Sequence, residues 1–202
     1  MIAVVDLGVM AVGSWINLLS SLGHSAQVCR EPGSLGDFDT IVFPGVGNFS
    51  RASQLLDQGG WRKPLISGIE EGKRFLGVCL GMQLLGESSE EGEGRGLGVF
   101  AFSSQKFDSA SGARVPHMGW NTVEWDESFE FAISEGEFYF THSYGVIGNT
   151  PWTVGITENG VHFTSVVSFS NVLGVQFHPE KSHAFGRQLV SSFLDRPPLA
   201  KA

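Results

Sequence analysis

The sequence lacks several features that would place it in other protein classes. It has only two cysteines in 202 residues, too few for a disulfide framework. No apolar run approaches the roughly 20 residues of a membrane-spanning helix. The apolar start, Met1-Ile2-Ala3-Val4-Val5, reaches Asp6 too early to be a signal peptide. Lys and Arg number 13 against 21 Asp and Glu and are scattered, so we expect no nucleic-acid partner.

Metal and nucleotide motifs are also missing. The six histidines form no His-x-His or His-Glu-x-x-His pair, and Cys29 and Cys79 have no cysteine close by in the sequence. The glycines at 92, 94, 96 and 98 follow acidic residues, not a strand, and Gly45-x-Gly47 lacks the third glycine of a dinucleotide fingerprint. We therefore expect no metal and no cofactor. The acidic run at 87–93 is interpreted as a solvated loop.

The composition is that of one folded domain over residues 1–202, with 42% hydrophobic and 17% charged residues. Short apolar runs at 2–5, 26–29, 40–43 and 74–78 alternate with helical periodicity at 12–22, 48–58 and 64–71. This alternation predicts an α/β fold with a mostly parallel central sheet flanked by helices. From Gly98 onward, shorter segments such as 113–116 and 120–125 predict added antiparallel strands, before a last helix at 185–194.

The most informative segment is Gly77-Val78-Cys79-Leu80-Gly81-Met82-Gln83. An apolar strand runs into a Gly-x-Cys-x-Gly turn and then into the start of a helix, which is the pattern of a nucleophile elbow with sulfur in place of the usual serine oxygen. A cysteine beside a helix N-terminus is favoured as the thiolate, which is its reactive form. The pattern therefore predicts an activated cysteine nucleophile.

A base for this nucleophile is predicted at the end of a second buried strand. His178 follows the apolar run at 172–177, and Glu180 lies two residues further on, on the same side of an extended chain. Pro179 between them blocks a helix. A carboxylate placed in this way can orient the imidazole and stabilise its protonated form, as in a serine-protease triad.

Each residue has a simpler interpretation when taken alone. A lone cysteine with apolar neighbours is often a small buried hydrophobe, which is how we interpret Cys29. A lone His-Pro-Glu segment can be a turn with a surface carboxylate. Together, however, Cys79, His178 and Glu180 supply a nucleophile, a base and an orienting group, which favours the catalytic interpretation.

These segments resemble the signatures of class I glutamine amidotransferases. The resemblance extends to Pro44-Gly45-Val46-Gly47-Asn48-Phe49, which is similar to the oxyanion loop of that family. Two further segments, Pro116-His117-Met118-Gly119-Trp120-Asn121 and Tyr139-Phe140-Thr141-His142-Ser143-Tyr144, resemble the glutaminase subunits of imidazole glycerol phosphate synthases. Those subunits serve histidine biosynthesis.

The resemblance implies hydrolysis of L-glutamine through a thioester on Cys79. The N–H of Leu80, directly after the nucleophile, is the natural first oxyanion donor, and the resemblance implies a second near Val46 or Gly47. It implies that Gln83 and the backbone of Ser143 and Tyr144 bind the substrate's amino-acid end. Gln83 is four residues past Cys79 on the same helical face; the alternative is an ordinary exposed polar position.

The resemblance also implies a partner, a (β/α)8-barrel cyclase that forms a heterodimer with this chain and receives the ammonia. The candidate docking residues are Trp120, Asn121, Tyr139 and Lys181. Their alternative interpretation is core aromatic residues and a solvated lysine. A cysteine nucleophile must stay reduced, which favours the cytoplasm.

Two departures from the subunit pattern leave other functions open. The run Asp6-Leu7-Gly8-Val9-Met10-Ala11 lacks the usual Tyr, second Gly and Asn. The run Lys181-Ser182-His183-Ala184-Phe185-Gly186 resembles paralogues thought to serve nucleotide-sugar or surface-polysaccharide amidation. A stand-alone cysteine hydrolase and a non-catalytic regulatory paralogue are the remaining alternatives. Gln83 and the segment His142-Ser143-Tyr144 argue against the first, and the complete triad argues against the second.

Overall fold

The computed structural model of the chain describes residues 1–8, 12–127, 129–131, 133 and 136–195. Strands and helices alternate through its first half, as the periodicity predicts. The elements of this half are β1 (Ile2–Val5), α1 (Val12–Ser21), β2 (Ala26–Cys29), η1 (Pro32–Asp37), β3 (Thr40–Gly45), α2 (Phe49–Gln58), α3 (Arg62–Glu70), β4 (Arg74–Cys79) and α4 (Leu80–Leu85).

The second half consists mainly of strands, and its last helix returns to the first half. Its elements are β5 (Ser88–Ser89), β6 (Ser103–Lys106), η2 (Ser109–Ser111), β7 (His117–Thr122), β8 (Glu124–Trp125), β9 (Glu137–His142), β10 (Tyr144–Ile147), β11 (Thr153–Glu158), β12 (His162–Phe169), β13 (Val172–Val175), η3 (Pro179–Lys181) and α5 (His183–Asp195).

In the described part of the chain, eleven strands form one sheet, ordered β2-β1-β3-β4-β13-β12-β10-β6-β5; β11 also pairs with β12, and β8 pairs with β11. The strands from β2 to β13 are parallel, whereas β12 pairs antiparallel with both β13 and β10. This arrangement confirms the predicted mostly parallel sheet with added antiparallel strands. It also places β13, which leads to His178, directly beside β4, which ends at Cys79.

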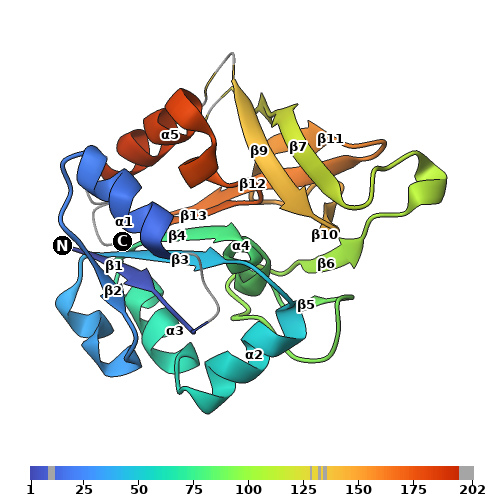
Figure 1. The fold of residues 1–202 in the computed structure, drawn as a ribbon. Helices are drawn as coiled ribbons and strands as arrows, with labels where there is room; N and C mark the ends of the chain where they lie inside the picture. Colours follow the sequence, from blue (N-terminus) through green and yellow to red (C-terminus); the bar gives the residue numbers. More distant parts are fainter. Residues whose placement is uncertain (9–11, 128, 132, 134–135, 196–202) are drawn as a thin grey trace.

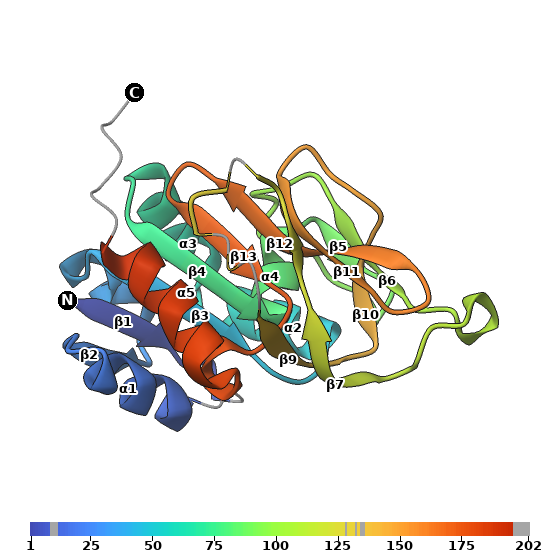
Figure 2. The ribbon, with the colours of Figure 1, turned by 90° about the horizontal axis from the view of Figure 1, so that it is seen from above.

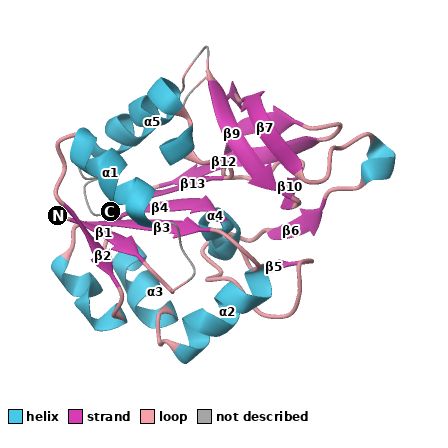
Figure 3. Cartoon of the chain, viewed as in Figure 1, coloured by secondary structure: helices cyan, strands magenta, loops and turns pink. Residues whose placement is uncertain are grey.

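Helices cover both faces of the parallel strands. Figure 1 shows α1 and α5 on one side of the sheet and α2 and α3 on the other. Seen from above, α1 and α5 overlie the parallel strands, and the β7–β9 ribbon lies beside α5 (Figure 2). Figure 3 shows how the helices gather around the parallel strands while strands dominate the opposite half. Since both faces are covered, β1, β3 and β13 are buried at every residue.

The helices form where the sequence pattern predicts them. In α1, the buried residues Trp15, Leu18 and Leu19 recur at helical spacing and face the sheet. In α2, Asn48 is the N-cap, and its side chain accepts a hydrogen bond from the Arg51 N–H at 3.0 Å. The predicted ends of α1, α2 and α3 lie within two residues of the observed ends.

One predicted strand is wrong. Residues 113–116 are irregular, and the ribbon strand β7 begins only at His117. The backbone of Arg114 pairs with a side chain instead of a strand: its N–H donates to Asn159 Oδ1 at 3.2 Å, and its C=O accepts from Asn159 Nδ2 at 3.0 Å. Pro116 has no N–H for a ladder. Position 159 lies far along the chain, so the sequence pattern could not reveal this pairing.

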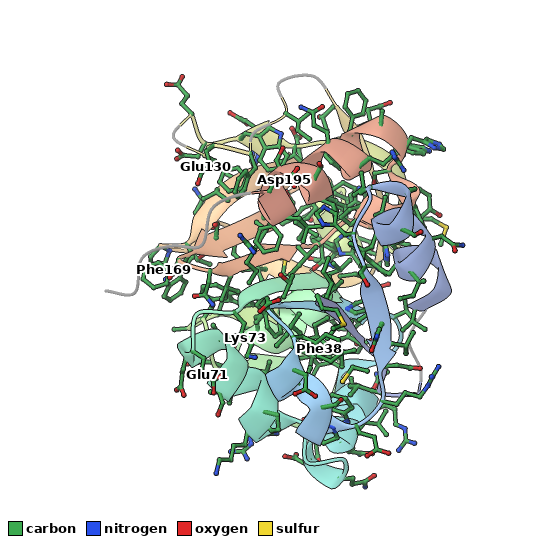
Figure 4. All side chains as sticks on the ribbon, turned by 90° about the vertical axis from the view of Figure 1, so that its left-hand side faces the viewer. Phe38, Glu71, Lys73, Glu130, Phe169 and Asp195 are labelled. Atoms are coloured by element: carbon green, nitrogen blue, oxygen red, sulfur yellow. The ribbon has the colours of Figure 1, made fainter. Side chains whose placement is uncertain are left out.

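The amino ends of the parallel strands form the end of the molecule away from Cys79, and Figure 4 views this end. Lys73, just before β4, donates from Nζ to the carbonyl oxygens of Gly36 and Phe38 at 2.8 and 2.7 Å. This lysine fastens η1 against the start of β4. Phe169, the last residue of β12, is exposed at the same end.

Candidate active site

Cys79 stands at a strained turn between β4 and α4. Its φ of 53° and ψ of −110° are rarely adopted by a residue with a side chain, and they aim the thiol out of the strand-to-helix turn. The turn is tight because β3 passes across the start of α4: a Cβ on Gly81 would lie 2.0 Å from the Phe43 carbonyl oxygen. The structure therefore has the geometry of a nucleophile elbow.

His178 and Glu180 form a buried pair beside the elbow. His178 Nδ1 lies 2.8 Å from Glu180 Oε1, and the two side chains are only 2% and 3% exposed. Burial alone would lower the pKa of His178, but hydrogen bonding and charge from Cys79 and Glu180 outweigh it and raise this pKa to about 10. His178 is thus an imidazolium at neutral pH, which stabilises a neighbouring thiolate.

The Nε2 atom of His178 is left for the reaction. Among the described residues it has no hydrogen-bond partner at normal distance, although it is buried and Cys79 is near enough to raise the pKa of the ring. Catalytic hydrogen bonds are often long before the substrate binds. The geometry suits proton transfer at Nε2, with Nδ1 held by the carboxylate.

Ser182 holds the turn that carries His178. Its hydroxyl donates to the His178 carbonyl oxygen at 2.6 Å and accepts from the Tyr139 N–H at 3.0 Å. The His178 N–H donates to the Tyr139 carbonyl oxygen at 2.8 Å. The departure noted at residues 181–183 therefore includes a fully buried serine that ties β9 to the catalytic turn.

A cleft of about 300 Å³ opens above Cys79. It brings together all the residues that were predicted to bind substrate or the oxyanion. Its lining includes Val46, Gly47, Cys79, Leu80, Gln83, Ser143, Tyr144 and His178, together with Glu91, Pro116, Thr141 and His142. A larger cleft of about 590 Å³ lies between α3 and residues 95–98, but its lining holds neither cysteine nor histidine.

Gln176 is a site residue that the sequence interpretation missed. It is fully buried, and its amide donates to Cys79 Sγ at 3.6 Å while its Oε1 accepts from Gln83 Nε2 at 3.1 Å. It therefore gives the sulfur a hydrogen-bond donor and also aligns Gln83. A single polar residue inside the apolar run at 172–177 was the available signal.

Glu91 is a second missed residue: Glu87, Glu90 and Glu93 of the run at 87–93 are exposed, as the prediction of a solvated loop requires, whereas Glu91 is partly buried. Its carboxylate lines the cleft and accepts a hydrogen bond from the Phe49 N–H at 2.8 Å, at the start of α2. Glu90 in the same run accepts from the Lys106 N–H at 2.8 Å. These carboxylates tie the loop to α2 and β6 and bring Glu91 to the cleft that Cys79 also lines.

Gln83 is buried, not an exposed polar position on the helix surface. Its Nε2 donates to the Tyr144 carbonyl oxygen at 2.9 Å as well as to Gln176 Oε1. Both amide hydrogens are then in use, so only the amide oxygen is left to meet a ligand. Gln83 can therefore receive a donor such as an ammonium group.

Three of the four candidate docking residues lie together. Trp120 is 44% exposed and packs edge-on against Tyr139, with ring centroids 5.9 Å apart, while Lys181 Nζ lies 5.6 Å from the Tyr139 centroid. His183 stacks on Trp120 at 5.1 Å. Asn121 does not share this face: it lies opposite the buried Phe138 and donates to the Glu158 carbonyl oxygen at 2.8 Å.

The altered loop after β1 is described only in part. Asp6 accepts from the Gly8 N–H at 2.8 Å and pairs with Arg30 at 3.1 Å. Residues 9–11 of this loop lie outside the described part of the chain. Cys29, at the end of β2, is buried against Ser34 and is remote from His178 in the sheet order, as expected for a structural cysteine.

Two negative findings concern the described residues only. No group of three or more His, Cys, Asp or Glu side chains there is arranged to hold a metal ion. No helix there is both long enough and apolar enough to cross a membrane.

Comparison with known proteins agrees with this geometry. The family model described as "Glutamine amidotransferase class-I" matches residues 3–196. The chain is 40% identical over 198 residues to "Imidazole glycerol phosphate synthase subunit HisH" of Desulfitobacterium hafniense, covering 96% of this chain and 93% of the relative.

Two further matches concern chain organisation and fold. The chain is 39% identical over 199 residues to "Imidazole glycerol phosphate synthase hisHF, chloroplastic" of Arabidopsis thaliana, covering 96% of this chain but 34% of that longer protein. A solved structure described as "Crystal structure of glutamine amidotransferase" matches with a TM-score of 0.73 at 19% identity, covering 96% of this chain and 97% of the other.

Proposed function

The chain belongs to the class I glutamine amidotransferase family, and from that premise we propose that it is the glutaminase subunit of an imidazole glycerol phosphate synthase in histidine biosynthesis. The observation that carries the proposal is the strained elbow cysteine beside a buried imidazolium–carboxylate pair. We propose further that residues 1–202 act as one glutaminase domain.

Cys79 is the nucleophile, His178 the proton carrier and Glu180 the orienting group in this proposal. The Cys79 thiolate attacks the side-chain amide carbon of glutamine. His178 gives its proton to the departing ammonia, and the resulting thioester is then hydrolysed by water that His178 activates. Glu180 holds His178 in the required tautomer without taking the proton. Gln176 supports the thiolate through its amide donor.

The tetrahedral intermediates need donors for their oxyanion. The N–H of Leu80 at the start of α4 is one, and an N–H at Val46 or Gly47 on the facing loop is the second. Gly47 has a φ of 103°, so its peptide is free to adopt orientations closed to other residues. Rotation of this peptide would bring the N–H toward the intermediate or away from it.

The remaining groups of the cleft match the two charged ends of glutamine. The Gln83 oxygen and the Glu91 carboxylate form an acceptor pair for the α-ammonium group. The Lys106 N–H donates to Glu90, so Tyr144 and Lys106 form a non-hydrogen-bonded pair, and the Tyr144 N–H points away from β6. In this proposal that N–H and the Ser143 backbone receive the α-carboxylate.

The ammonia released at Cys79 needs a dry route to a second active site, because free ammonia in water is mostly the non-nucleophilic ammonium ion. A fused relative combines HisH and HisF names in one longer chain. We propose a (β/α)8-barrel cyclase as the partner, docked on Trp120, Tyr139 and Lys181, in a heterodimer. A reducing compartment such as the cytoplasm keeps Cys79 active.

Labelling with an electrophile shaped like glutamine, a diazoketone amino acid, tests this function. Mass spectrometry should find the label on Cys79 and none on Cys29, and L-glutamine should protect Cys79 while L-asparagine should not. Equal labelling of both cysteines, or no protection by glutamine, would contradict the proposed substrate.

A further inference from the structure

We propose that Asn121, His117 and His142 are positioning residues: they form a hydrogen-bonded chain that fixes residues 143–144 for the carboxylate of glutamine. This inference rests on the proposed function, since it concerns how the same substrate is held. The hydrogen bonds of these three side chains lead to one another and to the Tyr144 carbonyl, not to Cys79, so their effect is exerted through the backbone at Tyr144.

The chain of contacts runs inward from the edge of the β7–β9 ribbon. The Asn121 amide lies 3.1 Å from His117 Nε2, His117 Nδ1 lies 3.0 Å from His142 Nε2, and His142 Nδ1 lies 2.8 Å from the Tyr144 carbonyl oxygen. His142 lines the catalytic cleft directly, next to residues 143 and 144.

The direction of every hydrogen bond follows from its two ends. The Tyr144 carbonyl can only accept, so His142 Nδ1 carries the hydrogen and its Nε2 accepts. His117 must then donate from Nδ1 and accept at Nε2 from Asn121. The second amide hydrogen of Asn121 goes to the Glu158 carbonyl at 2.8 Å, and its Oδ1 accepts from the Thr122 N–H at 2.8 Å. Every hydrogen bond from Asn121 to Tyr144 therefore donates in the same direction, toward Tyr144, and each side-chain N–H of the three residues has an acceptor.

The surroundings keep both rings neutral, as this polarity requires. Burial lowers the pKa of His142 to about 3, and burial together with the charge of Arg114 lowers the pKa of His117 to about 4. Phe140 packs against the His117 ring at 4.7 Å, and Phe107 packs against the His142 ring at 5.3 Å. Two adjacent buried histidines that stay neutral at neutral pH are suited to holding a position, not to transferring protons.

The end of this chain is the residue that meets the substrate. The Tyr144 carbonyl accepts from both His142 and Gln83, so both of its lone pairs are used and its peptide cannot rotate. The Tyr144 N–H belongs to the preceding peptide, whose Ser143 carbonyl accepts from the Phe107 N–H at 3.0 Å. With the peptides on both sides of Tyr144 held, the direction of its N–H is fixed, on the same side of the strand as its carbonyl. Asn121, at the other end of these hydrogen bonds, lies on β7, and the opposite face of β7 carries the exposed Trp120.

Substitutions of His142 separate this role from simple packing. His142→Asn keeps a donor at the position of Nδ1, His142→Gln keeps only a group near Nε2, and His142→Phe keeps the ring volume with no donor. We expect labelling of Cys79 by the glutamine-shaped diazoketone to slow about tenfold in the Gln and Phe variants. This factor corresponds to the loss of one hydrogen bond of about 1.4 kcal/mol. The Asn variant should slow much less, because it keeps the donor.

Asn121→Leu should slow the same labelling, because His117 Nε2 then loses its donor. Thr122→Val, at an exposed neighbour on β7, is the matched control and should label like the parent protein. Iodoacetamide needs the thiolate but no carboxylate site, so its reaction rate with Cys79 should be unchanged in all five proteins. In turnover assays, KM for glutamine should rise with little change in kcat.

The outcomes distinguish the two proposals. Rates that follow side-chain volume, with Phe best and Asn worst, would overturn the positioning role. A parallel fall in the iodoacetamide rate would also overturn it, since the defect would then lie in the triad or the fold. A parent protein that reacts with iodoacetamide but never with the glutamine-shaped reagent would overturn the proposed function, and the positioning role with it.

Discussion

At the scale of single residues, the site depends on two buried groups whose charge is set by their neighbours. His178 lies between a thiol and a carboxylate, and its charged form is stabilised by both despite burial. His142 is also buried, but its hydrogen-bond partners are the uncharged Tyr144 carbonyl and His117, and burial lowers its pKa to about 3. In the proposed mechanism the same residue type thus serves as a proton carrier at one position and as a fixed hydrogen-bond donor at the other.

The different roles of the triad residues predict different losses. Cys79→Ala should abolish glutamine hydrolysis, and His178→Ala should reduce it nearly as far, because no other group can carry the proton. Glu180→Gln should cost less, since it only orients the ring. Steady-state release of glutamate measures these losses. Equal losses for His178→Ala and Glu180→Gln would show that Glu180 does more than orient.

The charge on His178 predicts a titration that NMR can follow. With its pKa raised to about 10, the ring should show imidazolium ¹⁵N shifts throughout pH 6–8. The folded pKa lies above the unfolded value of about 6.5, so the charged ring contributes stability that is complete below about 6.5 and is lost as the pH rises through about 10. Cys79→Ala should lower this pKa. A neutral ring at pH 7 in the parent protein would contradict the ion-pair account.

At the scale of elements, the elbow depends on the close approach of β3 to the start of α4. Gly81→Ala would force its Cβ against the Phe43 backbone, so it should destabilise the protein by about 3 kcal/mol or more. Gly36→Ala, in η1, meets nothing within 4 Å and is the matched control. Denaturant unfolding measures both. A Gly81 variant as stable as the Gly36 variant would show that the two segments separate easily.

The elements that the sequence predicts well are those with local signals. The turn around Cys79 carries its glycines within a few residues, and α1 shows its apolar spacing directly. His178 was expected at a strand end, and β13 indeed lies beside β4.

Features that depend on distant partners were missed or misjudged. Gln176, Asn159 and Glu91 act on residues that lie between 42 and 97 positions away along the chain. Asn121 was expected on the docking face, but strand alternation turns it inward toward His117. A polar residue in an apolar run indicates that a partner exists, whereas its identity depends on the folded sheet.

At the scale of the whole molecule, the fold brings the candidate active site and the proposed docking face near one another. The cleft above Cys79 and the face of Trp120, Tyr139 and Lys181 meet at the β7–β9 ribbon, and the His178 turn is hydrogen-bonded to β9. A partner that presses on this ribbon contacts the same element that supports the histidine. Since hydrolysis without synthesis wastes glutamine, we expect low activity until the partner and its ligand bind.

The energy required for this coupling is modest. A hundredfold activation corresponds to about 2.7 kcal/mol of differential binding between the resting and active states. Reorientation of one peptide beside Gly47, whose φ of 103° suits glycine, is a change of that order. The resting loop would then direct a carbonyl toward the oxyanion position, and the active loop an N–H.

Glutamate release from L-glutamine, measured for this chain with and without a barrel cyclase and its nucleotide substrate, tests the central claim most directly. The parent protein and Cys29→Ala should be slow alone and accelerate about a hundredfold in the complex, an energy difference of about 2.7 kcal/mol. Cys79→Ala should release none, while its complex should still make product from added ammonia. Hydrolysis that persists in Cys79→Ala, or that is fast alone and unchanged by the partner, would contradict the account.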